Sequence, residues 1–411
     1  MSFFTLGALN AQTVNTGELH IAPETILSTV SNFDNTPTAT VINDGEFYVY
    51  ADFNNDGTVD FTMGEEGRTR FQGSTVQELT GNTVSYFYDV LFDNGASPTA
   101  SFELSSEVSV ANNASFNEGI VMNDGFGGMV IFEDSANHTG VNDGSHVDGH
   151  VQKHGDDNFQ FPIGDGQLFR FSAISAPDNA ADAFTSKYYF TNPLESTVNG
   201  ETPTADMPES IVLLDTAEFW TIINDSNTND VLLTLSYDGA TTTPEAIVAS
   251  PQTSIHIVRW DEALQLWVDE GGMVDEDSRT VTTPLRLDSY GIFTLARVES
   301  GEDEEDPVTV YNGVTPNGDG INDYLLIEGV ENLANNRVEV YNRWGVQVFG
   351  TDNYDNTLNR FDGFSTGRMS INNENDRLPT GTYYYILSYD ISTSGNTERM
   401  TQAGFLYITT E

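Results

Sequence analysis

Two loops rich in Asp, Asn and Gly have the residue types and spacing that bind a hard cation. The first, ADFNNDGTVDFT, places oxygen-bearing side chains in a D-x-N-x-D-G-x-x-D pattern at Asp52, Asn54, Asp56 and Asp60. Alternate side chains of this kind converge on one Ca²⁺, and the glycine allows the sharp bend that they need. Met63 stands where an EF-hand has its bidentate glutamate, so the pattern fits a shorter calcium loop. An Asn-Asp-Gly turn with solvated carboxylates explains the same residues, and both interpretations stay open.

The second loop lies near the C-terminus, in the stretch TPNGDGIND. It combines two glycines with four oxygen-bearing side chains, Asn317, Asp319, Asn322 and Asp323. Only two of the four are carboxylates, so a calcium site built from them would be weak. Asx side chains also fix turns by bonding to nearby backbone groups. We favour this structural turn, at the start of a module, and Ca²⁺ is the one cofactor that the sequence suggests.

Other chemistry has little support in the sequence. His146, His150 and His154 recur every four residues, but glycines interrupt the segment, and His150 and His154 are too far apart on a straight strand to share one Zn²⁺. The chain contains no nucleophile elbow, HExxH motif, P-loop or dinucleotide-binding glycine motif. The sequence therefore predicts a protein that is not an enzyme.

The charge of the chain excludes several classes of partner. Its 411 residues include 63 acidic and 15 basic side chains, a formal net charge of −48. Nucleic acids and anionic lipids are bound through cationic side chains, so neither is an expected partner. The chain has no cysteine, which excludes disulfides and thiolate metal sites.

The elements that position these loops are short β-strands. Gly, Asn and Asp recur at short intervals, as in the NDG triplets at Asn43, Asn55, Asn123 and Asn142. The runs between them are β-branched or aromatic, which is typical of strands. No window keeps an apolar stripe at helical spacing over three turns. The predicted fold class is all-β.

Composition divides the chain into five segments. Residues 1–11, MSFFTLGALNA, resemble a shortened signal peptide. Residues 12–154 have the turn rhythm of a β-solenoid or an irregular β-sandwich, and residues 155–300 have the longer strands of a β-sandwich. The acidic run GEDEEDP, residues 301–307, predicts a linker. Residues 308–411 hold 13 acidic and 6 basic side chains, so most of the negative charge belongs to the segments before them.

The tryptophans of the middle segment have two alternative uses. Trp260 and Trp267 flank DEALQL, which predicts a hairpin, and Trp220 follows a phenylalanine. Exposed tryptophans would stack on sugar rings, whereas buried ones would pack in the core. We favour core packing for the hairpin pair.

Two hairpin motifs characterise the C-terminal segment. In VEVYNRWGVQVF, apolar residues alternate on either side of NRWG, whose Gly345 supplies a positive φ. In LPTGTYYYILSYD, a turn precedes a strand with Tyr383 and Tyr385 on one face and Tyr384 on the other. Aromatic side chains on both faces predict a strand that is sandwiched or docks to a partner.

These motifs resemble a known family. TPNGDGIND, the NRWG hairpin, LPTGTYYY and the terminal GFLYI follow one another in this order. They are similar to the type B C-terminal sorting domain of type IX secretion system cargo, the gliding-motility-associated domain of Bacteroidota surface proteins. The resemblance covers residues 308–411 and implies an immunoglobulin-like β-sandwich.

The resemblance also implies a route, partners and a function. The route is export by a signal peptide, passage through the outer-membrane type IX translocon with an SprF/PorP-like outer-membrane protein, and delivery to the outer-membrane surface. The positions implied to face the receptor are Arg343, Trp344, Tyr383, Tyr384 and Tyr385. The expected function is gliding motility or adhesion, with a surface polysaccharide or an adhesin as candidate partner. A secreted carbohydrate-binding module or hydrolase that uses the same route is the alternative.

Overall fold

The protein folds almost entirely as β-structure. A computed structural model describes residues 12–226, 230–298, 308–318, 322–342, 346–365, 377–393 and 396–410. Strands account for 51% of the chain and helices for 3%, so the all-β prediction is confirmed. No helix in the described part has the length and apolar character needed to cross a membrane.

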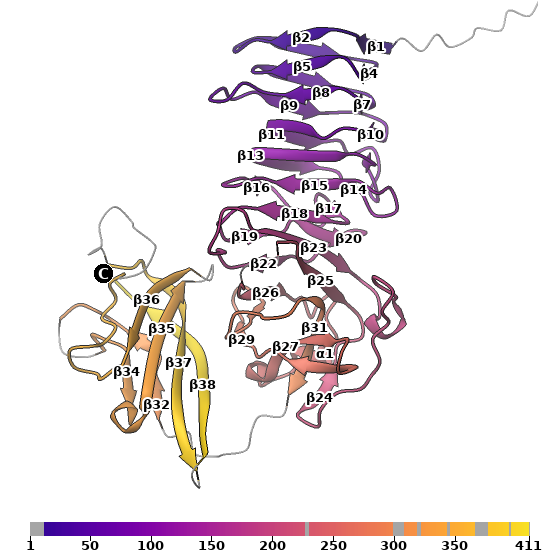
Figure 1. Cartoon of the computed structure of the whole chain (residues 1–411). Coiled ribbons are helices and arrows are strands. Elements are labelled where there is room, and N and C mark those ends of the chain that lie inside the picture. The colour runs from indigo at the N-terminus through magenta and orange to yellow at the C-terminus, as the bar shows by residue number, and fades with distance from the viewer. Residues whose placement is uncertain are drawn as a thin grey trace, which may run out of the picture. The chain divides into compact units, whose positions relative to one another are not determined.

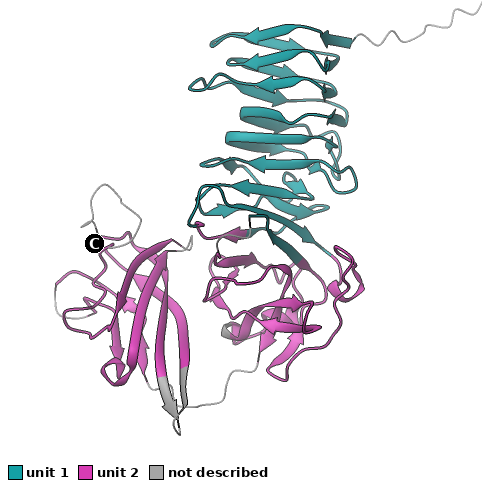
Figure 2. Ribbon diagram, viewed as in Figure 1, with its two compact units in different colours: residues 1–172, 178–190, 220–229 teal, residues 173–177, 191–219, 230–411 magenta. Residues whose placement is uncertain are grey.

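The chain divides into two compact units, which are shown in different colours in Figure 2. Unit 1 comprises residues 1–172, 178–190 and 220–229. Unit 2 comprises residues 173–177, 191–219 and 230–411.

Unit 1 is a β-solenoid in which short strands stack in parallel (Figure 1). The first three turns of the chain contain β1 (Gln12–Asn15), β2 (Glu18–Ile21), β3 (Ile26–Thr29), β4 (Asn32–Asn35), β5 (Thr40–Asn43), β6 (Glu46–Val49), β7 (Phe53–Asn55), β8 (Thr58–Asp60) and β9 (Arg68–Phe71). The later turns contain β10 (Gln77–Gly81), β11 (Ser85–Asp93), β12 (Phe102–Leu104), β13 (Glu107–Glu118), β14 (Val121–Met122), β15 (Met129–Phe132), β16 (Asn137–Thr139), β17 (Val147–Asp148) and β18 (Val151–His154). The sequence left a solenoid and a sandwich open, and the parallel pairing of each turn with the next selects the solenoid.

Phenylalanine rings fill the interior of the stack. Ring centroids of Phe33 and Phe53 lie 5.7 Å apart, those of Phe71 and Phe92 lie 5.9 Å apart, and those of Phe92 and Phe116 lie 5.4 Å apart, all in stacked geometry. Each of these side chains is at most 2% exposed. Burial of each ring contributes about 1.5–3 kcal/mol, so this Phe column stabilises the solenoid.

Asparagines at successive corners form a second internal column. The Asn15 amide donates to Asn35 Oδ1 at 3.0 Å, and the Asn35 amide donates to Asn55 Oδ1 at 2.9 Å. Asn55 also accepts a hydrogen bond from the backbone N–H of Gly57, as an Asx turn requires. A Cβ at Gly57 would lie 2.3 Å from the carbonyl oxygen of Ala39, so only glycine fits this corner. The NDG triplet at Asn55 is therefore a solenoid corner and not a hairpin turn.

The parallel stack continues past the boundary that the sequence suggests at residue 154. Strand β17 pairs in parallel with β20 (Ile163–Asp165), and β18 pairs antiparallel with β23 (Ala183–Tyr189). The last parallel strands are only two or three residues long. No change of composition marks such short strands, so the end of the stack lies further along the chain than we expect from sequence.

The only two lysines of the chain are buried at this end of the solenoid. The ammonium of Lys153 donates to the carbonyl of Glu133 at 2.7 Å, and that of Lys187 lies 2.6 Å from a carboxylate oxygen of Asp124. Their side chains are 1% and 6% exposed. The surface of the protein therefore presents no lysine, and it carries fewer positive charges than the sequence alone indicates.

The middle part of unit 2 contains two antiparallel sheets. In one, β31 (Gly291–Val298) pairs with both β24 (Ile211–Leu214) and β27 (Ile255–Asp261), and β27 also pairs with β28 (Leu266–Asp269). In the other, β30 (Thr280–Thr282) pairs with both β26 (Leu233–Ser236) and β29 (Met273–Asp275). The predicted hairpin is confirmed, because Trp260 on β27 lies opposite Trp267 on β28. Both rings are buried and their centroids are 5.7 Å apart.

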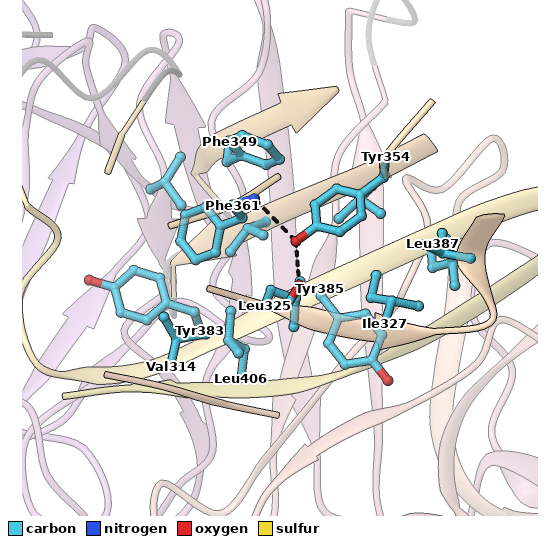
Figure 3. Packing of buried hydrophobic residues seen from close by; sticks show 14 of the residues in the cluster. Val314, Leu325, Ile327, Phe349, Tyr354, Phe361, Tyr383, Tyr385, Leu387 and Leu406 are labelled. Atoms are coloured by element: carbon cyan, nitrogen blue, oxygen red, sulfur yellow. Dashed lines mark hydrogen bonds between the residues drawn. The ribbon is translucent and has the colours of Figure 1, made fainter. Parts of the chain in front are cut away.

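The C-terminal part of unit 2 contains a five-stranded and a two-stranded sheet. The larger has the order β33 (Gly313–Val314), β38 (Asn396–Ile408), β37 (Gly381–Thr393), β35 (Ala334–Asn342) and β36 (Gln347–Asp352). The smaller pairs β32 (Thr309–Tyr311) with β34 (Leu326–Glu328). Both sheets contribute side chains to one buried cluster (Figure 3). Within it, the Tyr354 hydroxyl donates to the carbonyl of Leu325 and accepts from the N–H of Phe361.

The remaining elements are short. They are β19 (Phe159–Gln160), β21 (Leu168–Phe169), β22 (Ser172–Ile174), β25 (Phe219–Asn224), α1 (Glu245–Val248) and the 3₁₀ turns Pro193–Glu195, Gln252–Ser254 and Val330–Asn332.

Candidate functional site

The loop that opens the C-terminal domain is fixed by one of its carboxylates. The backbone N–H of Gly318 donates to Asp323 Oδ1 at 2.6 Å, and Gly318 has a φ of +82°. Asn322 also has a positive φ, of 53°, and Asn317 precedes the glycine. Asp319 lies outside the described residues. These contacts are those of a turn held by an Asx side chain, and calcium binding by this loop stays a prediction.

The NRWG hairpin joins β35 to β36. Two hydrogen bonds join Asn342 and Val346. The backbone N–H of Asn342 donates to the Val346 carbonyl at 2.9 Å, and the backbone N–H of Val346 donates to the side-chain Oδ1 of Asn342 at 3.0 Å. Asn342 is buried and thus closes the hairpin from inside. Arg343 and Trp344, the two residues expected to face a receptor here, lie outside the described residues.

The three consecutive tyrosines of β37 alternate between the two faces of the sheet. Tyr383 and Tyr385 belong to the core of the domain, and the Tyr383 hydroxyl donates to the carbonyl of Pro379 at 2.9 Å. A Cβ at Gly404 would lie 2.8 Å from the hydroxyl of Tyr385, so this ring packs directly on glycine. Tyr384 is on the opposite face, and all three side chains are at most 7% exposed. Their predicted role as receptor contacts remains untested.

Exposed aromatic side chains of this sheet lie instead on the neighbouring strand. Phe405, directly opposite Tyr384 in the β37–β38 register, is 46% exposed, and Tyr407 is 50% exposed. Both come from the terminal motif GFLYI, whose period of two signals that Phe405 and Tyr407 share one face. That alternation does not show which face is covered, so sequence reasoning missed their exposure.

The Asp52 loop of the solenoid does not gather its carboxylates at one point. Asp52 accepts hydrogen bonds from the amide of Asn32 at 2.8 Å and from the backbone N–H of Glu78 at 3.0 Å. Asp60, at the end of β8, accepts from the N–H of Phe61 at 2.8 Å. The two carboxylates thus have different partners, and those of Asp52 lie in neighbouring turns of the solenoid.

The other two residues of this loop, Asn54 and Asp56, bond to each other and to residues of the preceding and the following turn. The amide of Asn54 donates to Asp34 at 2.9 Å and to Asp56 Oδ2 at 3.1 Å. Asp56 Oδ1 accepts from the backbone N–H of Asn82 at 3.1 Å. Among the described residues, the one group of three acidic or histidine side chains within reach of a shared ion is Asp134, Asp156 and Asp157. Its ligand atoms come from exposed or half-exposed side chains, and Asp157 is also 3.5 Å from the Lys153 ammonium.

We expect Asp56→Ala to lower the stability of the protein by about 1 kcal/mol, because hydrogen bonds to Asn54 and Asn82 are lost. The same bonds lower the pKa of Asp56, with that from Asn54 contributing most. Thermal melting of the full chain, in calcium and in EDTA, checks this. The hydrogen-bond account predicts an equal loss in both conditions. A loss in calcium that disappears in EDTA would assign a cation to the loop instead.

His146, His150 and His154, which recur every four residues, lie in different surroundings. His146 is fully buried, with Nδ1 3.0 Å from the carbonyl oxygen of Asn142. His154 Nδ1 lies 3.0 Å from a carboxylate oxygen of Glu133. Burial lowers the pKa of His150. No group of candidate metal ligands in the described part of the chain contains any of the three.

Comparison with known proteins gives one match, at the C-terminal domain. No curated protein and no solved structure matches the chain. Residues 308–408 match the CHU_C type IX secretion signal domain. This range begins where the core of the C-terminal domain begins, at Val308, and ends at Ile408, the last residue of β38. The chain is therefore a type IX secretion system cargo that carries a C-terminal sorting domain.

Proposed function

We propose that the protein is a non-enzymatic adhesin displayed on the outer-membrane surface, where it serves in attachment or gliding motility. The sorting domain at residues 308–408 carries the export step. What precedes it is a rigid, strongly acidic β-solenoid and a second β-rich part, which suit a passenger that presents a surface to the outside. An SprF/PorP-like outer-membrane protein is the proposed partner in attachment, as for type B sorting domains.

Two further segments belong to this proposal. The signal peptide predicted at residues 1–11 and the linker predicted at 301–307 both lie outside the described residues. They are consistent with a cargo that crosses the inner membrane first and keeps its sorting domain accessible on a short tether.

Removal of residues 308–411 should abolish display of the passenger at the cell surface. The test expresses the full chain and the truncated chain in a Bacteroidota host with a working type IX channel. Surface protease accessibility and periplasmic fractionation then locate each form. We expect the full chain at the surface and nearly all of the truncated chain in the periplasm. A truncated chain that reaches the surface contradicts the proposal.

A folding control accompanies this experiment, because a misfolded passenger would also stay inside. The fluorescence of Trp220, Trp260 and Trp267 reports on the passenger, since all three side chains are buried and precede the sorting domain. The truncated chain should keep the emission of a full-length Trp344→Phe variant, because the deletion also removes Trp344. A host that lacks the channel should hold the full chain in the periplasm as well.

The alternative function, carbohydrate binding, needs aromatic side chains other than these tryptophans. The three described tryptophans are at most 2% exposed, so they pack in the core as we favoured and offer no stacking surface. Tyrosine and phenylalanine side chains of the solenoid provide another candidate surface.

A further inference from the structure

A shallow groove lies on the outer face of the solenoid, over β8, β11 and β13. Its volume is about 180 Å³. These strands are neighbours in the parallel stack (Figure 1), with Ser85 of β11 opposite Val59 of β8 and Tyr86 of β11 opposite Ser109 of β13. The groove is thus built on three strands that are joined by parallel pairing.

Aromatic side chains form the floor and one wall of this groove. Tyr86 lines it and is 44% exposed, although its neighbour Phe87 is fully in the core. Phe61 lines it as well and packs edge-on against Tyr88, with 5.6 Å between ring centroids. Tyr86 is outside the Phe column that stabilises the solenoid, so packing of the core does not require an aromatic ring there.

Carboxylates lie at the margins of the groove. Asp60 lines it on β8, and Glu133 lines it on the far side. Glu133 is held by Ser109 at 2.6 Å and by His154 at 3.0 Å, and the His154 bond is the main reason why the pKa of Glu133 lies below its usual value. An ionised carboxylate only accepts hydrogen bonds, and it has several acceptor positions. The groove therefore offers acceptors to a ligand that brings hydroxyl or amine donors.

Three observations narrow the class of ligand. The net charge of −48 and the absence of exposed lysine disfavour an anionic polymer. Strand β11 is paired with β8, β9 and β13, so it offers no free edge to an extended peptide. The groove is also lined by only seven residues, whereas each partner in a stable protein complex contributes about 20–30 residues.

We propose that this groove, which we call the Tyr86 groove, binds one ring of a neutral polysaccharide. Sugar rings combine an apolar C–H face, which stacks on an aromatic ring, with hydroxyl donors at their edge. The Tyr86 groove has the complementary arrangement, an exposed ring between carboxylate acceptors. The proposal rests on the proposed function, surface display of the passenger, and it names the chemistry of the surface to which that passenger attaches.

Titration of the purified full chain with hexasaccharides tests the proposal. The probes are cellohexaose, mannohexaose and xylohexaose, with hexagalacturonate as the anionic comparison. We expect calorimetry to detect weak binding of at least one neutral probe, and Tyr86→Ala to weaken it about tenfold or more. Tyr86→Phe, which keeps the ring, should retain most of the affinity. Circular dichroism of each variant confirms that the solenoid is folded.

Tyr50→Ala is the matched control. Tyr50 is 42% exposed on the same solenoid and stacks on Tyr48, but it does not line the Tyr86 groove. Its replacement should leave binding unchanged. The proposal is overturned if no neutral probe binds, if Tyr86→Ala binds as well as the unmodified chain, or if hexagalacturonate binds equally well. Because export plays no part in this titration, its failure would leave the sorting experiment unaffected, and the reverse also holds.

Discussion

Raising the pH from 6 to 8 should lower the free energy of unfolding of the protein by about 2 kcal/mol more than that of its Asp215→Asn variant. The responsible group is Asp215, whose carboxyl is fully buried next to another fully buried acid, Glu218. Asp215 Oδ1 accepts a hydrogen bond from the N–H of Ala217 at 2.8 Å. Asp215 Oδ2 has no hydrogen-bond partner in the described part of the chain. Burial, with the charge of Glu218 as a second cause, raises the pKa of Asp215 to about 8.

The direction of the effect follows from proton binding by the two states. In the unfolded chain this carboxyl ionises near its ordinary value of 3.8, whereas in the folded protein it holds its proton up to about pH 8. Between these values the folded state binds more protons than the unfolded state, so stability falls as the pH rises. The loss is complete above pH 8. Urea unfolding followed by the fluorescence of Trp260 and Trp267, which lie in the same unit, measures it.

Other buried groups have different pH dependences. Burial lowers the pKa of His138 to about 4, so its contribution to stability rises with pH until the unfolded histidine has lost its proton near pH 6.5, and this opposes the effect of Asp215 at the lower end of the window. Burial raises the pKa of Asp148 to about 6, which places most of its effect between pH 4 and 6. Asp148→Asn should therefore preserve most of the fall between pH 6 and 8. Asp215→Asn should remove it, because an amide keeps the bond from Ala217 and carries no charge. Equal pH dependence in Asp215→Asn and the unmodified protein would contradict the assignment.

The buried acid pair also shows what the sequence could not reveal. In a chain with 63 acidic residues, the tetrapeptide that contains Asp215 and Glu218 looks like one more solvated turn. The two lysines are a second example. The charge of Lys153 and Lys187 favours surface positions, but they lie on β18 and β23, which pair with each other, and both side chains are buried. Burial of a charged side chain depends on contacts between segments distant in sequence. Local composition gives no signal of these contacts.

Local features of the fold were more predictable. Alternation and turn residues predicted the all-β class, and the spacing of Trp260 and Trp267 predicted their hairpin correctly. Alternation could not separate a solenoid from a sandwich, since inward and outward residues follow the same period of two in both. The choice depends on pairing between turns, as when Phe33 lies opposite Phe53, twenty residues later. In the sequence, only the recurrence of Phe at about that interval, as at Phe33, Phe53, Phe71 and Phe92, indicates it.

The candidate sites divide in the same way. The motifs of the sorting domain identified it because four short sequences recur in a fixed order, and residues 308–408 match the signal domain. The calcium pattern around Asp52 contains only residues of one solenoid turn. In the folded chain, Asp52 and Asp56 bond to residues of adjacent turns, at Glu78 and Asn82, some 26 positions away. A pattern within one turn of a solenoid cannot show what the next turn supplies.

Asn35→Ala should destabilise the solenoid by about 3 kcal/mol, because it leaves several buried polar groups without partners. Asn35 is fully buried in the middle of the asparagine column. Its amide donates to Asn55 Oδ1 at 2.9 Å and to the carbonyl of Thr58 at 3.0 Å, and its own oxygen accepts from Asn15 at 3.0 Å. Alanine provides none of these bonds, and the buried site gives water little access to replace them. Hydrogen exchange of the amides in β4 and β7 measures the loss.

Two matched variants separate this mechanism from a general loss of packing. Asn15→Ala removes a residue of the same type from the half-buried start of the column and should cost about 1 kcal/mol. Asn35→Asp keeps the shape but turns a carboxylate oxygen toward two acceptors, Asn55 Oδ1 and the Thr58 carbonyl. It should destabilise the solenoid at least as strongly as alanine at neutral pH, and less in acid, where the carboxyl regains a donor. Equal losses of stability for Asn15→Ala and Asn35→Ala would mean that the hydrogen bonds between the asparagines of successive turns add no stability of their own.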